Sequence, residues 1–352
     1  METLFNESLE LLQRLIATPS FSKEEDKVAS IIEEFFATHQ VQTQRQANNV
    51  WVKNKYFNPA LPTVLLNSHH DTVKPNTGYT RDPFKPEIID GKLYGLGSND
   101  AGGPLVSLIA TFLHYYERKD LKYNIVLAAT AEEEISGTGG IESIWNLLTP
   151  VDFAVVGEPT LSDMATAEKG LMVLDCVAHG KPGHAAREEG INAIYEAIED
   201  IQWIRNYKFP KKSSTLGEMK MSVTIINAGR QHNVVPGECT FTIDVRVTDQ
   251  YTLEEALEII RQNVKSTVTP RSLRMRPSGI DENHPLVLSA KKLGLKLYGS
   301  PTTSDQAMIP VASVKMGPGD SARSHSADEF IYVDEIRTGI EKYISLLDNV
   351  IL

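Results

Sequence analysis

Several apolar residues near the start of the chain recur at helical spacing, at Phe5, Leu9, Leu12 and Ile16. Pro19 follows closely, as expected where a helix has ended. Ser22 and Glu25 match a capping box, and residues 28–36 continue an apolar stripe with the period of an α-helix. The pattern therefore predicts two amphipathic helices in succession.

Short apolar runs that are rich in branched residues follow this helical region. They occupy residues 63–66, 125–129, 153–156 and 312–314. Each run is too brief for a helix and is typical of a buried strand. Helical stretches such as residues 105–116 lie between them, so strands alternate with helices. The sequence predicts an α/β fold in which helices cover both faces of a mixed sheet.

The middle of the chain has a different rhythm. It is interpreted as strand 171–177, helix 193–206, strand 221–226, strand 238–247, helix 253–265 and strand 272–276. This is the order of a ferredoxin-like βαββαβ unit, which can fold as a separate module because its own sheet and helices supply a core. We therefore expect an inserted α+β domain at residues 170–281, with residues 1–169 and 282–352 forming the α/β domain.

The predicted strand at residues 238–247 alternates apolar and polar side chains. Phe241 and Ile243 alternate with Thr242 and Asp244, and Arg246 continues the polar series. Because successive side chains of a strand point to opposite faces, we expect Arg246 to point away from the core of its own domain.

Size and composition agree with two globular domains. The chain has 352 residues, of which 41% are hydrophobic and 23% are charged. The formal charge of −11 and the lack of a dense Lys and Arg patch argue against binding to nucleic acid. Cys176 and Cys239 lack the spacing of a zinc knuckle or redox motif, so we interpret them as small core residues in a reducing compartment.

The N-terminal segment carries acidic residues among its apolar ones and has no cleavage site of small residues. No uninterrupted apolar run approaches the length needed to span a membrane. We therefore expect a cytoplasmic protein with no membrane partner.

Side chains that can bind a metal follow the first predicted strand. His69 and Asp71 are two residues apart and lie on one side of an extended chain. A histidine with a nearby carboxylate suits a metal ligand and the group that orients it. A polar surface turn explains this segment equally well when the segment is taken alone.

A glycine-dense loop at residues 95–103 carries one central carboxylate, Asp100, and leads into a predicted helix. Its glycines permit the backbone to approach a ligand closely. We reject nucleotide binding because the loop lacks both the dinucleotide fingerprint and the lysine of a P-loop.

Acidic residues stand at the carboxyl ends of two more predicted strands. Glu132, Glu133 and Glu134 follow one strand, and Glu158 follows another. An α/β sheet places its functional groups at these ends. Like charges held together beside a buried strand favour a cation, and an acidic solvated loop is the alternative.

A loop of small residues near the C-terminus, at residues 317–329, contains His325. A single histidine in a loop is more often solvated than bound to a metal. Its significance therefore depends on the other segments.

Taken in order, these five segments resemble the dinuclear zinc metallopeptidase family that includes acetylornithine deacetylase, succinyl-diaminopimelate desuccinylase, aminoacylase and glutamate carboxypeptidase. The resemblance extends over nearly the whole chain. It implies two Zn2+ ions, with Co2+ as a substitute metal, and a carboxylate that bridges them. The ligands that it implies are His69, Asp100 as the bridge, Glu134, Glu158 and His325.

The resemblance also assigns catalytic roles. Glu133 would act as general base and then as acid, while Asp71 would orient His69 without touching the metal. Two zinc ions that share a carboxylate lower the pKa of a bound water towards neutrality, so hydroxide becomes available to attack an amide. His70 departs from the family pattern. We interpret it as a bystander, and an exchange of roles with His69 stays open.

The insert resembles the dimerisation domain of the same family. Residues 180–184, Gly-Lys-Pro-Gly-His, match a segment whose histidine, here His184, would donate a hydrogen bond to the oxyanion in a partner subunit's site. Asn233 and Arg246 match residues that contact substrate. The resemblance thus implies a homodimer. For Arg246, an ion pair with an acid on the strand surface is the alternative.

The Gly-Glu-Pro segment at Glu158 resembles the deacylase and carboxypeptidase members of the family. The short chain with its single insert is most similar to the acetylornithine deacetylase group, which implies a role in arginine biosynthesis. The implied reaction removes an acetyl or succinyl group from an N-acyl amino acid such as N-acetylornithine or N-acetylcitrulline. A dipeptidase or carboxypeptidase acting on small peptides is the first alternative. A noncatalytic binding protein is the second, and a full ligand set beside Glu133 argues against it.

Overall fold

In the computed structural model, which describes residues 2–148 and 150–350, strand β3 (Thr63–His69) is buried along its whole length. Val64 and Leu66 belong to one apolar core, and Leu65 belongs to another. Because consecutive side chains of a strand point to opposite faces, the sheet that contains β3 is covered on both faces. This double burial explains why Val64, Leu65 and Leu66 are apolar in succession.

The sheet around β3 is mixed. Its strands, in order, are β1 (Gln44–Gln46), β2 (Asn49–Lys53), β6 (Asn124–Thr130), β3, β7 (Phe153–Gly157), β17 (Ala312–Met316), β8 (Met164–Glu168) and β15 (Ser278–Gly279), with β16 (Leu297–Ser300) also paired with β8. β3 is parallel to β6 and β7, and β7 is parallel to β17, whereas β2 is antiparallel to β6. The parallel strands therefore end at one edge of the sheet.

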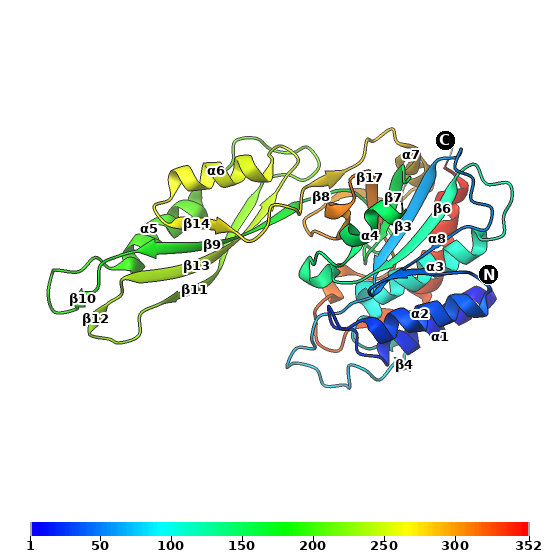
Figure 1. Cartoon of the computed structure of the whole chain (residues 1–352), viewed down its shortest axis with the longest axis horizontal. Helices are drawn as coiled ribbons and strands as arrows, with labels where there is room; N and C mark the ends of the chain where they lie inside the picture. Colours follow the sequence, from blue (N-terminus) through cyan, green and yellow to red (C-terminus); the bar gives the residue numbers. More distant parts are fainter. Residues whose placement is uncertain (1, 149, 351–352) are drawn as a thin grey trace. The chain divides into compact units, whose positions relative to one another are not determined.

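Helices cover both faces of this sheet (Figure 1). One face packs against α1 (Glu2–Ile16), α2 (Asp26–Thr38), α3 (Gly103–Tyr115), α7 (Pro285–Lys292) and α8 (Val333–Asp348). The other packs against α4 (Ile141–Leu148). The predicted α/β architecture is confirmed.

The predicted capping box before α2 is wrong. No side chain caps α2 at its N-cap residue, Glu25. Instead, Ser22 Oγ donates to Asp71 Oδ2 at 2.6 Å, and the Glu25 carboxylate accepts hydrogen bonds from other segments. Both side chains therefore bind residues distant in the sequence, instead of the nearby backbone N–H groups that a capping box would use.

The chain divides into two units. The first contains Met1–Thr166, Gly279–Tyr298 and Ser304–Leu352, and the second contains Ala167–Ser278 and Gly299–Thr303. The second unit has an antiparallel sheet in the order β11-β13-β9-β14. Its elements are β9 (Gly170–His179), α5 (Ala193–Asn206), β11 (Lys220–Ala228), β13 (Glu238–Val247), α6 (Leu253–Asn263) and β14 (Thr267–Pro270). The order and pairing are those of a ferredoxin-like unit, as predicted.

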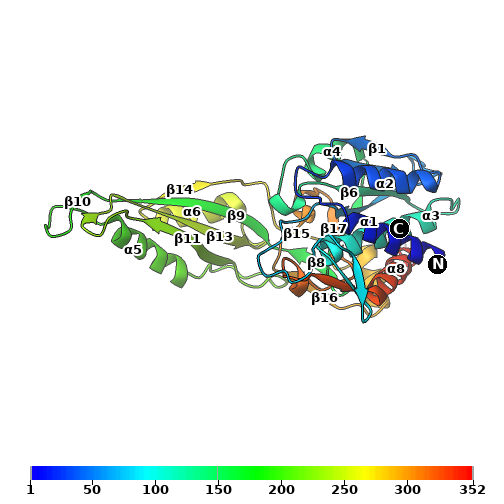
Figure 2. The ribbon, with the colours of Figure 1, turned by 90° about the horizontal axis from the view of Figure 1, so that it is seen from below.

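Strands β9, β11 and β13 run side by side (Figure 2). Phe241 and Ile243 of β13 are buried, and Arg246 on the opposite face is partly exposed, so the predicted alternation is confirmed. Cys176 and Cys239 are free, buried thiols in the core of this unit, as predicted.

The prediction of a last strand at residues 272–276 is wrong, because β14 lies earlier, at Thr267–Pro270. Val268 pairs with β9 and its side chain is buried. Pro270 then removes a backbone donor, and the following residues form only isolated hydrogen bonds with β9, at Arg271 and Met275. The apolar residues at 273 and 275 imitate a strand pattern without forming a ladder.

Shorter strands complete the structure. β4 (Glu87–Ile89), β5 (Lys92–Tyr94) and β18 (Phe330–Tyr332) form a small sheet in the order β18-β5-β4. In the second unit, β10 (Gly183–His184) pairs with β12 (Val234–Val235). Among the described residues, no helix has the length and apolar character that crossing a membrane requires.

Candidate metal centre

The parallel strands bring predicted metal ligands to one edge of the larger sheet. His69 is the last residue of β3 and lies opposite Thr130, the last residue of β6. Glu158 directly follows β7. Asp100 lies in the turn η1 (Ser98–Gly102) that leads into α3. Strand ends and one turn therefore supply the site from distant parts of the chain.

Asp100 lies between two imidazoles. Its Oδ1 is 3.3 Å from His69 Nε2, and its Oδ2 is 3.8 Å from His325 Nε2. Oε2 of Glu134 is 2.9 Å from His325 Nε2, and Oε1 of Glu158 is 3.8 Å from His69 Nε2. The structure thus brings together all five residues that the sequence analysis selected as ligands.

Two overlapping groups of side chains have donor atoms close enough to hold a cation. One contains His69, Asp100 and Glu134, the other contains His69, Glu133 and Glu158, and within each group the donor atoms lie within 4.8 Å of one another. Imidazole and carboxylate groups are ligands that suit Zn2+. Because His69 belongs to both groups, they form one continuous site.

The site concentrates negative charge. Burial is the main reason that the pKa of Glu133 lies well above its usual value, and repulsion from Glu158 adds to it. Burial and the charge of Asp100 raise the pKa of Glu158 to about 8. Burial lowers the pKa of His69, but hydrogen bonds to Asp100 and Asp71 outweigh it, so this pKa is well above its usual value. The cluster therefore attracts positive charge.

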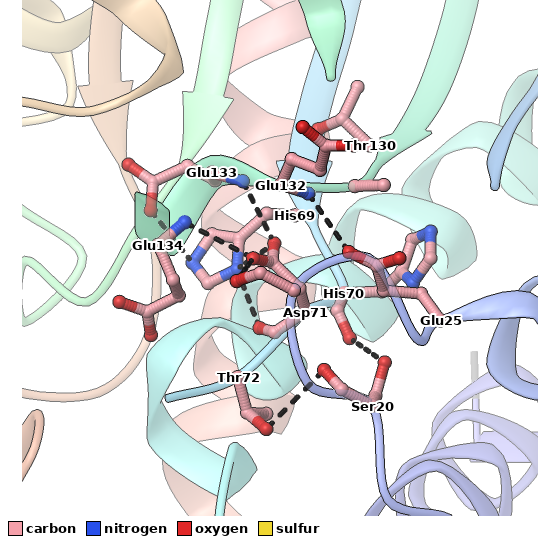
Figure 3. A network of polar contacts seen from close by, with 12 residues as sticks. Ser20, Glu25, His69, His70, Asp71, Thr72, Thr130, Glu132, Glu133 and Glu134 are labelled. Carbon is pink, nitrogen blue, oxygen red and sulfur yellow. Dashed lines mark hydrogen bonds and ion pairs between the residues drawn. The ribbon is translucent and has the colours of Figure 1, made fainter. Parts of the chain in front are cut away.

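Asp71 supports both His69 and the acidic turn that follows β6 (Figure 3). Nδ1 of His69 donates to the Asp71 carbonyl oxygen at 3.0 Å, which leaves Nε2 facing the carboxylates. The backbone N–H groups of Glu133 and Glu134 donate to Asp71 Oδ1 at 3.0 Å and Oδ2 at 3.2 Å. Asp71 thus contacts the histidine through its carbonyl oxygen and holds the two acids through its carboxylate.

Glu132 has a different role from the two acids that follow it. Its φ of 57° is in the left-handed region, so the chain reverses immediately after β6. Its Oε2 accepts a hydrogen bond from the Gly139 N–H at 3.2 Å. A Cβ atom at Gly137 or Gly139 would clash with the Glu132 side chain, so a larger residue at either position would force that side chain to move. The carboxylate of Glu132 is therefore directed into the glycine turn.

Glu329 holds the glycine-dense loop, a role that sequence reasoning missed. Its Oε1 accepts hydrogen bonds from the N–H groups of Asn99 at 2.8 Å and Asp100 at 3.0 Å, and its Oε2 accepts one from Gly97 at 3.2 Å. Glu329 is 2% exposed, and burial raises its pKa to about 8. Its partners are backbone groups roughly 230 residues away, so no local pattern identifies it.

Two more buried polar residues lie beside the site. Asp305, which the sequence analysis also missed, accepts a hydrogen bond from Thr130 Oγ1 at 2.7 Å, and burial raises its pKa to about 6. His70 donates from Nε2 to the carbonyl oxygen of Asn48 at 2.9 Å. Within the described residues it belongs to neither candidate ligand group, which contain the preceding His69.

The second unit contains the remaining predicted residues. The N–H of Ala185 donates to the Asn233 carbonyl oxygen at 3.0 Å, so His184 and Asn233 are exposed neighbours at the paired strands β10 and β12. Arg246 lies on β13, where its Nε and Nη2 donate to the two carboxylate oxygens of Asp244 at 2.8 and 3.0 Å. The ion pair considered as the alternative for Arg246 is therefore present.

Known proteins resemble this chain over almost its full length. The model of peptidase family M20/M25/M40 matches residues 65–349. The acetylornithine deacetylase of Proteus mirabilis (strain HI4320) is 26% identical over 374 residues, covering 97% of this chain and 96% of that protein. The succinyl-diaminopimelate desuccinylase of Wolbachia pipientis wMel is 27% identical over 372 residues, with 97% and 92% covered.

A solved structure shares the fold. It is a Bacillus subtilis protein described as a dinuclear metal-binding peptidase of the M20 family, with a TM-score of 0.75 and 15% sequence identity. The match covers 99% of this chain and 98% of that one. At this identity, the likeness supports the same arrangement of elements.

Glu329→Gln should destabilise the protein by about 1–3 kcal/mol. The carboxylate now accepts hydrogen bonds from backbone N–H groups, and in the variant an amide NH2 group would face one of these donors. Urea unfolding of metal-depleted protein measures the change. Glu341→Gln, at an exposed position of α8, is the matched control and should alter stability by less than about 0.5 kcal/mol. Equal midpoints for the two variants would contradict the role assigned to Glu329.

Proposed function

The chain belongs to peptidase family M20/M25/M40, and from this premise we propose that it is a two-zinc amidohydrolase acting on N-acyl amino acids. The acyl group is acetyl or succinyl, and the amino acid resembles ornithine or citrulline. One observation carries the proposal. The carboxylate of Asp100 presents one oxygen to His69, at 3.3 Å, and the other to His325, at 3.8 Å.

The distances favour a division of the ligands between two zinc ions. His69 lies near Oδ1 of Asp100 and is close to Glu158, whereas His325 lies nearer Oδ2 and contacts Glu134. Each side offers one imidazole nitrogen and two carboxylate oxygens, a donor set that suits zinc and leaves a position open. Asp100 would then bridge the two ions.

The chemistry of the donor set fits these ions. Burial, with repulsion from neighbouring carboxylates added to it, raises the pKa values of Glu133 and Glu158, and a divalent cation stabilises carboxylates held in this way. Bound zinc ions would activate water and neutralise negative charge that develops on the amide oxygen. Cobalt is expected to replace zinc, because it accepts the same ligands.

Glu133 is the proposed general base. Its backbone N–H is held by Asp71, and its Oε2 lies 4.0 Å from His69 Nε2, so its carboxylate reaches the edge of the metal site. It takes a proton from the attacking water and delivers it to the departing amine as the C–N bond breaks. Burial, which raises the pKa of Glu133, suits a group that must hold this proton near neutral pH.

Relatives support the substrate class. One relative that matches 97% of this chain is described as an acetylornithine deacetylase, and another is described as a succinyl-diaminopimelate desuccinylase. Both names denote removal of an acyl group from an amino group. The fold is shared with a protein described as a peptidase, so hydrolysis of small peptides is the second candidate.

The second unit would contribute to substrate binding. We infer that Arg246, whose planar guanidinium suits a carboxylate, exchanges its contact with Asp244 for a substrate carboxylate. Asn233 and His184 lie side by side at the paired strands β10 and β12, which supports their joint action on a substrate in the partner subunit's site. There His184 would donate a hydrogen bond to the oxyanion.

An exposed apolar surface supports a homodimer. β11 is an edge strand of the second unit's sheet, and Ile226 on it is 52% exposed. Tyr195 and Ile198 of α5 are 66% and 41% exposed. An unpaired strand edge beside apolar side chains is suited to pairing with a second copy of the chain.

The zinc-loaded protein should release acetate or succinate from acyl derivatives of ornithine, citrulline, diaminopimelate or an apolar amino acid. Product release, followed for each derivative together with unacylated dipeptides and carboxypeptidase substrates, identifies the class. Faster cleavage of unacylated dipeptides would replace the proposal with a peptidase. Cleavage of none would favour a noncatalytic binding protein.

Glu133→Gln should lower kcat by about 10²- to 10⁴-fold, because the amide cannot accept the proton of the attacking water. It should keep both zinc ions, as measured by elemental analysis. Glu134→Gln is the matched comparison, since it removes a proposed ligand and should lower zinc content instead. Near-normal turnover in Glu133→Gln would refute its assignment as base.

Ile226→Lys should convert a dimer into a monomer, because a charged side chain on the edge strand opposes burial against a second copy. Light scattering coupled to size exclusion gives the mass. Glu258→Lys, on the exposed face of α6, should leave the mass unchanged. If His184 acts in the partner subunit's site, the monomer should also lose activity while it retains zinc.

A further inference from the structure

Glu25 has a buried carboxylate whose partners lie outside its own helix. The residue is 0% exposed, although it stands at the N-terminal boundary of α2. Oε1 accepts hydrogen bonds from the N–H groups of Lys23 at 2.7 Å and Glu132 at 3.2 Å, and Oε2 accepts one from Asn48 Nδ2 at 2.6 Å. The carboxylate therefore connects the N-terminal segment to the acidic turn after β6 (Figure 3).

Glu132 is the residue in that turn that most needs such support. Its left-handed conformation is unfavourable for a residue with a side chain, and surrounding contacts must hold it. Besides the bond from its N–H to Glu25, its carbonyl oxygen accepts from the Gly137 N–H at 2.8 Å, and its carboxylate accepts from Gly139. The backbone and the side chain of Glu132 are thus both restrained.

Successive N–H groups of the acidic turn donate to buried carboxylates. Glu132 donates to Glu25, while Glu133 and Glu134 donate to the two oxygens of Asp71. The two accepting carboxylates are themselves coupled, because Ser22 Oγ, three residues before Glu25, donates to Asp71. The direction in which the chain leaves β6 therefore decides where Glu133 and Glu134 lie.

We propose that Glu25 is a positioning residue of the metal centre, which holds Glu132 in its left-handed conformation and thereby places Glu133 and Glu134. The inference rests on the proposed function, because it takes Glu134 to be a zinc ligand. Glu25 acts through the backbone and touches neither metal nor substrate. A purely helix-capping role does not account for it, since its carboxylate does not cap α2.

Two substitutions separate the shape of the side chain from its charge. Glu25→Ala removes every acceptor, so the N–H of Glu132 loses its partner. Glu25→Gln keeps an oxygen for the N–H groups of Lys23 and Glu132, and Asn48 can turn its amide to present an oxygen to the new NH2 group. Glu24→Ala, at the exposed neighbouring position, is the matched control.

The experiment measures affinity for Zn2+ alone, by competition with a chromophoric chelator on metal-depleted protein. Glu25→Ala should bind at least one zinc about 10- to 100-fold more weakly, the usual effect of losing a group that orients a ligand. Glu25→Gln should restore most of the affinity, and Glu24→Ala should match the wild type. Folded Glu25→Ala protein with wild-type zinc affinity would overturn the proposal, even if its melting temperature were lower.

Asn48→Ala decides the question if Glu25→Ala does not fold. Asn48 is partly exposed, and its loss removes one of the hydrogen bonds that hold the Glu25 carboxylate. Zinc affinity should fall in the same direction but by less than for Glu25→Ala. Wild-type affinity in Asn48→Ala would then count against the proposal.

Zinc binding needs no substrate, so the two proposals can fail separately. A wild-type protein that binds two zinc ions and cleaves no acyl amino acid would refute the substrate assignment and leave the role of Glu25 standing. A wild-type protein that binds no zinc would overturn both.

Discussion

Repulsion between carboxylates governs the edge of the larger sheet where β3, β6 and β7 end. Asp100, Glu133 and Glu158 surround the imidazole of His69, and burial keeps water from screening them. Burial is the main cause of the raised pKa values of Glu133 and Glu158, and the charges of neighbouring carboxylates add to it. A cation offsets this repulsion, and the surrounding structure must hold the carboxylates in place until one arrives.

The chain meets this requirement with a second set of carboxylates, which face backbone N–H groups instead of the site. Asp71 holds the N–H groups of the acidic turn, Glu329 holds those around Asp100, and Glu25 holds the residue that begins the turn. Charge-assisted hydrogen bonds of this kind are stronger than neutral ones. Asp71 and Glu329 thus fix the backbone of the segments whose side chains, those of Glu134 and Asp100, can bind metal.

The second unit is notable for the side chains that it exposes. His184 and Asn233 are exposed together at its paired strands β10 and β12, and its edge strand and α5 expose apolar side chains. The second unit thus contains both the residues proposed to contact substrate and the surface proposed to bind a second copy of the chain. For this reason we propose that hydrolysis of the substrate depends on formation of the dimer.

Local sequence patterns determined a large part of the outcome. Short, mainly apolar runs identified β3, β6, β7 and β17, and the ends of two of these strands identified His69 and Glu158. Such patterns are contained within a few consecutive residues. The tertiary structure alone decided what required distant partners. Glu25 does not form the predicted capping box but accepts a hydrogen bond from the N–H of Glu132, which is 107 residues away. Glu329 accepts one from the N–H of Asn99, which is 230 residues away. A local sequence pattern cannot identify such partners. A backbone N–H group is present in every residue except proline, so a carboxylate that binds one places no requirement on the side chain of its partner.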